Sequence, residues 1–496
     1  MKSGTTLADL LADPGSSAPA IISTSALVVV SYKALAEQIE RLAGQLRSSG
    51  LKHGDCVAIV LPNSLEFLVV FLALTHARLV AAPLNPADKP DEIRFFIEDA
   101  HARAVVADGA NSTVRIAVVG LGLPIWQPRV DSRGVVQIPE LPPVSRISID
   151  APNAYDIALF AYTSGTTGRP KCVPLSHGNV LWSSRDIATH YRLSSADCGL
   201  VVLPLFHGHG LIGATLSTLA SGGCVIVPPR FSASEFWKLF REHHATWYTA
   251  VPTIHQVLLE RADSDDAPHS GPRFIRSCSA PLAPTILTKL ENRFGAPVLE
   301  AYGMTEASHQ VASNPLPPLP RKPGTVGLSE EISIIDEKGR HLAANTPGEV
   351  VVRGPNVMRG YRNNPETNAA AFIDGWFRTG DIGAIDSDGY LALTGRIKDL
   401  INRGGEKISP AEVEAVLLEN PAVTDAAVFG VPDPKYGGEV SAAVVLKLAT
   451  TAQELQTFCR SRLADFKVPK VIHQVSAIPK NAMGKAQRRD LTALFS

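Results

Sequence analysis

The sequence is poor in cysteine, in net charge and in long apolar runs. Its six cysteines are scattered without a CxxC pair, which argues against a disulfide framework, a zinc ribbon and an iron–sulfur site and fits a reducing compartment. The formal charge of -1 provides no global attraction to nucleic acid or to an anionic membrane. The most apolar long segment, residues 65–79, carries Glu66, His76 and Arg78 and is too short to span a bilayer. We therefore expect neither nucleic acid nor a membrane as a partner.

Neither end of the sequence carries a familiar targeting signal. The first residues lack a charged segment followed by a long apolar run, which a secretory signal would require. The last three residues, Leu494, Phe495 and Ser496, do not form a peroxisomal tripeptide. We expect a cytoplasmic protein and a monomer.

Alternating strands and helices predict an α/β fold with doubly wound parallel sheets in two successive regions. In the first region, helices are expected over residues 35–46, 64–76 and 91–100, and strands over 56–61, 79–84 and 104–107. In the second, strands are expected over residues 200–203, 224–227, 246–251, 274–277 and 298–301, and helices over 211–220, 234–244, 254–261 and 284–294.

The composition and the predicted elements of the sequence change twice after residue 315. Short strands separated by proline and glycine first predict a small β-rich subdomain. Beyond residue 396, helices and strands predict a compact α+β unit. We therefore divide the chain into an N-terminal domain over residues 1–396, a hinge over 397–400 and a small mobile C-terminal lid domain over 401–496.

The stretch YTSGTTGRPK, residues 162–171, follows an apolar run and predicts a strand that ends in a phosphate-binding loop. Glycines let backbone amides approach an anion, hydroxyls donate to phosphate oxygens, and the final lysine adds positive charge. The residues expected to hold a nucleotide triphosphate are Thr163, Ser164, Gly165, Thr166, Thr167, Gly168 and Lys171. The spacing of the glycines differs from that of the nucleotide-triphosphatase P-loop. The alternative is a flexible linker, which rarely follows a buried strand and ends in Arg-Pro-Lys.

Four further polar loops follow predicted strands, at residues 204–210, 252–253, 279–281 and 302–306. In doubly wound sheets the functional loops lie at the carboxyl ends of the strands. We therefore expect these loops and the phosphate-binding loop to form one site.

Five motifs occur in order along nearly the whole chain: TSGTTGRPK, YGMTE at residues 302–306, TGD at 379–381, GRIKD at 395–399, and Pro479-Lys480 with Gly484-Lys485. Together they resemble the adenylate-forming superfamily of acyl-CoA synthetases, adenylation domains and luciferases. The resemblance implies that a carboxylate attacks the α-phosphate of ATP and that the thiol of coenzyme A then displaces AMP. ATP, Mg²⁺ and coenzyme A are the implied cofactors.

The resemblance also implies roles for single residues. Thr305 would contact the α-phosphate, and Glu306 would help to bind magnesium. Tyr302 would stack on adenine, while Asp381, supported by Arg396, would accept hydrogen bonds from both ribose hydroxyls. Further nucleotide contacts are expected from Ser279, Ala280, Pro281, Glu300 and Ala301.

By the same resemblance, Lys485 would bridge the substrate carboxylate and the α-phosphate, although Met483 stands where the family usually has serine or threonine. Rotation of the C-terminal domain about Lys398 would then withdraw this lysine. The residues expected to meet coenzyme A are Gly404, Gly405 and Glu406. The alternative for these glycines is a surface turn.

The acid pocket is expected to contain His207 and His209 of the segment FHGHG, with Ser279 and His309; His207 is also a catalytic candidate. Weaker candidates are Thr253, His255 and Arg276. Histidines and a hydroxyl favour a short, doubly charged acid, because each buried carboxylate must be paired or hydrogen-bonded. A metal site at the two histidines of FHGHG is the alternative, but no cysteine or carboxylate cluster accompanies them.

Three stretches narrow the choice of acid. Residues 247–256, 274–280 and 401–410 resemble oxalyl-CoA synthetases of plants and fungi. This resemblance implies oxalate as the substrate, in the first step of its CoA-dependent breakdown. The alternatives are a ligase for malonate or a 4-coumarate-type acid, a stand-alone adenylation domain, and a catalytically silent nucleotide-binding module.

Overall fold

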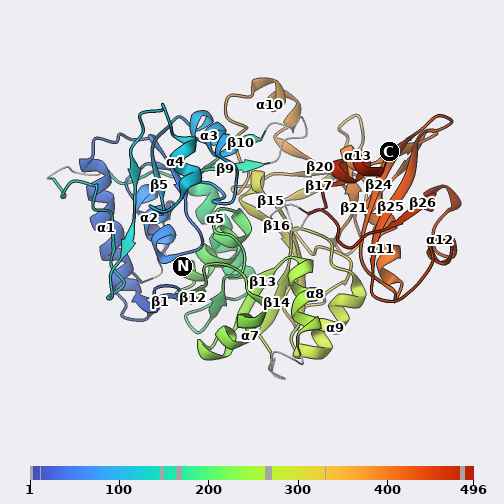
Figure 1. Cartoon of the computed structure of the whole chain (residues 1–496), viewed down its shortest axis with the longest axis horizontal. Helices are drawn as coiled ribbons and strands as arrows, with labels where there is room; N and C mark the ends of the chain where they lie inside the picture. Colours follow the sequence, from blue (N-terminus) through green and yellow to red (C-terminus); the bar gives the residue numbers. More distant parts are fainter. Residues whose placement is uncertain are drawn as a thin grey trace.

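The computed structural model describes residues 4–11, 13–145, 150–163, 170–262, 271–329, 331–480 and 486–495 (Figure 1). Two large sheets with helices form most of the N-terminal part, and a small β-rich part follows. An α+β unit lies at the end of the molecule opposite the first helices (Figure 1). The predicted fold class is confirmed.

The first sheet has the strand order β10-β9-β4-β3-β5-β6 and is parallel except between β9 and β10. Its strands are β3 (Cys56–Val60), β4 (Val80–Pro83), β5 (Ala102–Ala107), β6 (Ile125–Trp126), β9 (Ile157–Thr163) and β10 (Lys171–Ser176). The helices along this part of the chain are α1 (Tyr32–Ser48), α2 (Leu65–His76), α3 (Pro90–Asp99) and α4 (Ser112–Ala117). Two short strands, β7 (Arg129–Val130) and β8 (Val136–Gln137), pair with each other.

Helix α2 is apolar on every side, and residues 67–75 are all buried. The Ser64 hydroxyl accepts a hydrogen bond from the Phe67 amide at 3.2 Å and caps the first turn. A helix that is apolar all round belongs in a protein core or in a membrane. No helix in the described ranges combines the length and apolar character needed to cross a bilayer.

The second sheet has the strand order β16-β15-β14-β13-β11-β12-β1-β2. Its strands are β1 (Pro19–Ser23), β2 (Val28–Ser31), β11 (Cys198–Leu200), β12 (Cys224–Val227), β13 (Trp247–Ala250), β14 (Phe274–Ser277), β15 (Val298–Met304) and β16 (His309–Ser313). Helices α7 (Ala233–Glu242), α8 (Pro252–Glu260) and α9 (Pro284–Phe294) connect the parallel strands. The sequence predicts all of these connecting helices, and it predicts β14 and α9 with the observed bounds.

The prediction of a loop at residues 302–306 was wrong for its first half. Strand β15 continues to Met304 and forms an antiparallel hairpin with β16, which pairs Met304 with His309. A short 3-10 turn over Thr305–Ala307 connects the two strands. Thr305 and Glu306 therefore lie in the tip of a hairpin at the edge of the sheet.

Helix α5 (His177–His190) was not predicted, although Ser176 caps it by accepting a hydrogen bond from the Asn179 amide at 3.2 Å. It contacts β9 and β10 of the first sheet and β16 of the second, and so joins the two sheets. The helix predicted over residues 211–220 begins as a π-helix over His209–Leu216 and continues as α6 (Ser217–Ala220).

The β-rich part is a five-stranded sheet with the order β17-β18-β20-β19, in which β21 also pairs with β20. Its strands are β17 (Ile332–Ile335), β18 (Gly348–Val352), β19 (Phe372–Ile373), β20 (Trp376–Ile385) and β21 (Leu391–Arg396), with helix α10 (Pro365–Ala371) before β19. Pairing of β20 with β21 sets Asp381 directly opposite Arg396.

The C-terminal unit contains a three-stranded sheet with its own apolar core. Its strands are β24 (Val423–Asp433), β25 (Gly437–Leu446) and β26 (Val471–Gln474), and its helices are α11 (Pro410–Glu419), α12 (Ala452–Arg460) and α13 (Arg488–Phe495). The hairpin of β22 (Ile401–Arg403) and β23 (Glu406–Ile408) precedes this sheet. The Lys407 ammonium lies 3.2 Å from the Glu337 carboxylate of the β-rich part and connects the two units.

The β15–β16 hairpin predicts the effect of one substitution. A Cβ atom at Gly303 would overlap the carbonyl oxygen of His309 on the facing strand. We expect Gly303→Ala to lower the free energy of unfolding by about 1–3 kcal/mol, because the backbone must shift. Denaturant titration measures this change. In the exposed control Gly15→Ala the nearest atom lies at 3.7 Å, and an equal loss in that variant would contradict the account.

Candidate active site

The carboxyl ends of neighbouring parallel strands gather most of the predicted acid-pocket residues. His209 follows β11, and its Nδ1 lies 3.0 Å from the hydroxyl of Ser279, which follows β14. The Nε2 of the same ring lies 2.6 Å from the hydroxyl of Thr249 on β13. His309 joins this group from the hairpin strand β16. The structure therefore brings together three predicted residues from separate segments of the chain.

The rings of His209 and His309 are stacked, with centroids 4.7 Å apart and planes inclined by 25°. His309 has φ +87° and Ser308 has φ +50°, so two consecutive non-glycine residues lie in the left-handed region. Gly213 of the π-helix makes room for the His309 ring, because a Cβ atom there would overlap Nε2. The His309 Nε2 atom is buried without a hydrogen-bond partner among the described residues.

Arg276 lies behind this pair and is fully buried. Its guanidinium donates hydrogen bonds to the Tyr191 hydroxyl at 2.8 Å and to Gln310 Oε1 at 3.0 Å. It also donates to the Thr249 hydroxyl at 3.0 Å and to His209 Nε2 at 3.1 Å. All four partners are neutral, and no described carboxylate forms an ion pair with Arg276.

Burial and the neighbouring positive charge keep both imidazoles neutral. Burial, followed by the neighbouring His309 and Arg276, lowers the pKa of His209 well below its ordinary value. Burial and then Arg276 lower the pKa of His309 in the same direction. The pocket consequently offers neutral rings beside one permanent cation.

A metal ion is a poor occupant for this pocket. Donor atoms of His209, Cys278 and His309 do lie within 4.8 Å of one another. The Arg276 guanidinium, 3.1 Å from one of those donors, would repel a cation in this buried setting. The same charge attracts an anion, so the arrangement fits a carboxylate better than a metal.

The remaining acid-pocket candidates lie around this group. His207 is half-buried, and its Nδ1 accepts a hydrogen bond from the His209 amide at 3.3 Å. His255 is buried at the start of α8, where its Nδ1 lies 3.4 Å from the Tyr248 hydroxyl and burial lowers its pKa to about 4. Thr253 lies in the first turn of the same helix.

On the nucleotide side, Thr163 and Lys171 are paired at the ends of β9 and β10. The Lys171 ammonium lies 4.8 Å from the centre of the Tyr361 ring, and the Tyr361 hydroxyl donates to Glu306 Oε1 at 2.8 Å. Tyr361 thus links the predicted phosphate-binding lysine to the predicted magnesium ligand. Five predicted loop residues fall outside the described ranges: Ser164, Gly165, Thr166, Thr167 and Gly168.

The predicted ribose site is preassembled from three residues. Arg396 donates through Nε to Asp381 Oδ1 at 2.5 Å and through Nη2 to Oδ2 at 3.4 Å. The Tyr302 hydroxyl donates to Asp381 Oδ2. Burial and the Asp381 charge raise the pKa of Tyr302, so this hydroxyl stays protonated. The hydrogen bonds from Arg396 and Tyr302 therefore fix the orientation of Asp381.

The other predicted nucleotide residues surround the strand ends. Ala280 and Pro281 follow Ser279 after β14, and Ala301 is buried in β15. Glu300 is also buried in β15, where its Oε2 accepts a hydrogen bond from the Gly324 amide at 2.9 Å.

On the coenzyme A side, Lys398 lies exposed in a 3-10 turn over Ile397–Asp399. Gly404 and Gly405 form the turn of the β22–β23 hairpin with φ +60° and +97°, and Glu406 beside them is exposed. These glycines thus form a surface turn. Their contact with coenzyme A stays a prediction. Lys485 and Met483 lie outside the described residues.

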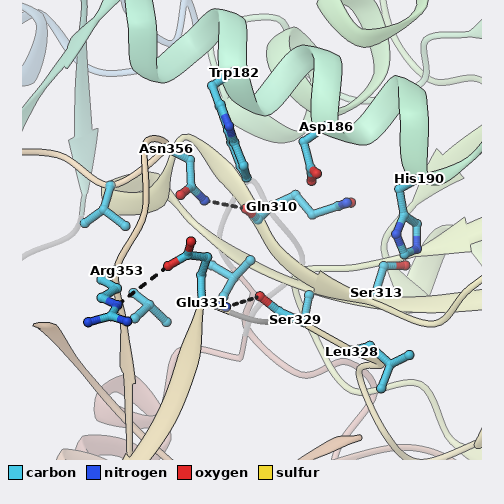
Figure 2. Close-up of a pocket in the computed structure, with 14 residues that line it drawn as sticks. Trp182, Asp186, His190, Gln310, Ser313, Leu328, Ser329, Glu331, Arg353 and Asn356 are labelled. Carbon is cyan, nitrogen blue, oxygen red and sulfur yellow. Dashed lines mark hydrogen bonds and ion pairs between the residues drawn. The ribbon is translucent and has the colours of Figure 1, made fainter. Parts of the chain in front are cut away.

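A cavity of about 300 Å³ with polar and apolar lining residues lies between α5 and β16 (Figure 2). Trp182, Asp186 and His190 point from α5 toward Gln310 and Ser313 of β16. The predicted site residues do not line this cavity. Gln310 links it to the acid pocket, because its side chain accepts a hydrogen bond from Arg276.

Sequence reasoning missed several residues of the site. Tyr361, Thr249, Gln310 and Tyr191 were not predicted, and Arg276 was ranked low. A buried strand that contains arginine, as in Phe-Ile-Arg-Ser, is an available signal, because such a charge needs a partner or a function.

Glu300 predicts a pH effect on stability. Burial raises its pKa from 4.5 to about 7, although the hydrogen bond from the Gly324 amide acts to lower it. Because the folded pKa exceeds the unfolded one, the folded state binds more protons between pH 4.5 and 7, and stability is lost as the pH rises through this window. We expect the free energy of unfolding of Glu300→Gln, relative to that of the wild type, to rise by about 1–3 kcal/mol between pH 5 and pH 8. Unfolding titrations at several pH values measure it, and a difference independent of pH would contradict it.

Comparison with known proteins identifies the family of the chain. Residues 12–362 match the family described as AMP-binding enzyme, and residues 412–485 match the AMP-binding enzyme C-terminal domain. The sequence is 47% identical to an oxalate–CoA ligase of Arabidopsis thaliana over 96% of this chain and 95% of that protein. It is 43% identical to an oxalate–CoA ligase of Saccharomyces cerevisiae over 89% of this chain and 87% of that protein.

The solved structures include a close match in fold. ATP-bound MatB from Rhodopseudomonas palustris superposes with a TM-score of 0.89 at 33% identity, covering 99% of this chain and 98% of that one. The chain belongs to the AMP-binding enzyme family and is an AMP-forming acid–CoA ligase.

Proposed function

We propose that this enzyme is an oxalate–CoA ligase. Oxalate attacks the α-phosphate of ATP to give oxalyl-adenylate and diphosphate, and the thiol of coenzyme A then displaces AMP to give oxalyl-CoA. The observation that carries the proposal is the buried pocket of His209, His309 and Ser279 backed by the Arg276 cation. Similarity to the plant and yeast oxalate–CoA ligases supports it independently.

The chemistry of the pocket favours a small diacid. A second carboxylate that enters a buried site must be paired or hydrogen-bonded, and a permanent cation with polar donors meets that need. A phenylpropenoid acid such as coumarate would need an apolar cavity in the same place. The stacked imidazoles and the hydroxyl of Ser279 occupy the pocket with polar groups instead.

The nucleotide side supports the roles expected from the motifs. Asp381, held by Arg396, retains lone pairs for two ribose hydroxyls. Lys171 and Thr163 stand at the two ends of the phosphate-binding loop. The Glu306 carboxylate has one oxygen on the Tyr361 hydroxyl and is the donor type that magnesium prefers, so it fits a metal ligand. When bound, magnesium would neutralise phosphate charge during adenylation.

The two half-reactions need different groups beside the α-phosphate. We assign adenylation and acid binding to residues 1–396, a hinge to 397–400 around Lys398, and a mobile lid to 401–496. Lys485 would face the acid and ATP in the first step. Gly404, Gly405 and Glu406 would face coenzyme A after rotation, and the open turn of their hairpin supports close approach of a ligand.

The acid is tested by AMP release with ATP and coenzyme A across oxalate, malonate, succinate, acetate and coumarate. We expect oxalate to give the highest kcat/KM, because it alone among these acids has its second carboxylate bonded directly to the first. A higher kcat/KM for malonate, succinate, acetate or coumarate would contradict the proposed substrate.

Lys485 is tested by separating the half-reactions. We expect Lys485→Ala to slow adenylation by about two to three powers of ten, as for loss of one preorganised charge contact. Thioester formation from supplied oxalyl-adenylate should be affected much less. Lys480→Ala, which removes a cation 2.6 Å from Asp425 and next to the same segment, is the matched control. Equal losses of Lys485→Ala in both steps would contradict the domain rotation.

A further inference from the structure

The hydrogen bonds around Arg276 have a fixed direction. A guanidinium has only donors, so His209 Nε2, 3.1 Å from Arg276 Nη1, must accept. A neutral imidazole that accepts at Nε2 carries its proton on Nδ1. That Nδ1–H points to the Ser279 hydroxyl oxygen at 3.0 Å, which therefore accepts from His209. Arg276 thus selects the tautomer of His209 from behind.

This direction leaves the Ser279 hydroxyl hydrogen free to donate. Ser279 is half-buried at the carboxyl end of β14 and has φ +74°, a conformation that turns it out of the strand. Its oxygen is already used as an acceptor by His209, so its hydrogen suits a ligand group that can only accept. An ionised carboxylate is such a group, whereas an amide or an ammonium is not.

The charge of Arg276 gives the second argument. Arg276 is a fully buried cation whose hydrogen bonds go to Tyr191, Gln310, Thr249 and His209, and among the described residues it lacks a carboxylate partner that would offset its desolvation. An apolar side chain of similar size would fill this space without that cost. A cation retained beside a ligand pocket under these conditions is explained by an anion that binds there.

We propose that Arg276 is a positioning residue that selects doubly charged acids. It acts through His209 and Ser279: the guanidinium fixes the imidazole, the imidazole fixes the serine hydroxyl, and the hydroxyl donates to the second carboxylate of the acid. The inference rests on the proposed function and adds the group that separates a doubly charged diacid from its singly charged analogue.

The test compares oxalate with oxamate, in which an amide replaces one carboxylate at nearly the same size. Wild type, Arg276→Met and Arg276→Lys are assayed for kcat/KM with both acids and for the KM of ATP. We expect Arg276→Met to lower kcat/KM for oxalate by about 10²-fold and for oxamate by less than about tenfold, with the KM of ATP unchanged. Arg276→Lys, which keeps the charge and a donor, should recover at least about tenfold of the loss.

Equal losses of kcat/KM for both acids in Arg276→Met would overturn the inference, because removal of a merely structural arginine would affect the two reactions alike. The double variant Arg276→Met, Ser279→Ala should be no worse for oxalate than the poorer single variant. Fully additive losses would show that Arg276 does not act through Ser279.

If Arg276→Met does not fold, Ser279→Ala and Arg276→Lys decide the question. Ser279→Ala must lower the ratio of kcat/KM for oxalate to kcat/KM for oxamate, and an unchanged ratio overturns the inference. The proposed function fails separately, when the wild type prefers another acid of the panel. If the wild type is selective for oxalate but the variants keep its ratio of kcat/KM for oxalate to kcat/KM for oxamate, only the role of Arg276 is overturned.

Discussion

The site depends on a single backbone turn at the tip of the β15–β16 hairpin. Tyr302 and Glu306 bond to Asp381 and Tyr361 in the proposed nucleotide site, and His309 stacks on His209 in the proposed acid pocket. Between them, Ser308 and His309 both adopt left-handed φ values, which cost about 1–3 kcal/mol each. Buried hydrogen bonds hold the turn in place: Ser183 donates to the Ser308 carbonyl at 2.6 Å, and the Ser308 hydroxyl donates to the Asn356 carbonyl at 2.8 Å. Strain of this kind is retained where it places reacting groups.

The two arginines near the hairpin, Arg396 and Arg276, differ in whether a carboxylate balances their charge. On the nucleotide side, Arg396 is paired with the buried Asp381 carboxylate, so the site is balanced before a ligand enters. On the acid side, Arg276 has only neutral partners, so its charge is balanced when an anion enters. This contrast fits a reaction that joins a mobile small acid to a nucleotide held by its sugar. It also explains why neutral histidines, rather than further cations, line the acid pocket.

Much of this arrangement could be predicted from the sequence, for identifiable reasons. Helix α9 and strand β14 follow strong local periodicity, and the parallel strands place Ser279 and the FHGHG histidines at one sheet edge. Strand β16 could not be recognised, because its segment His-Gln-Val-Ala-Ser is polar and becomes a strand only by pairing with β15. The importance of Arg276 was also hidden, since it arises from partners on four separate segments of the chain and not from any local motif. Tyr361 belongs to no motif and reaches Glu306 across the fold.

A crystal structure with oxalate and a non-hydrolysable ATP analogue tests the central claim most directly. The account predicts one oxalate carboxylate within hydrogen-bonding distance of the Ser279 hydroxyl and His309 Nε2, with the ribose on Asp381 and the triphosphate between Thr163 and Lys171. Oxalate bound elsewhere, for example in the cavity beside Gln310 and Asp186 with the two stacked histidines left untouched, would contradict it.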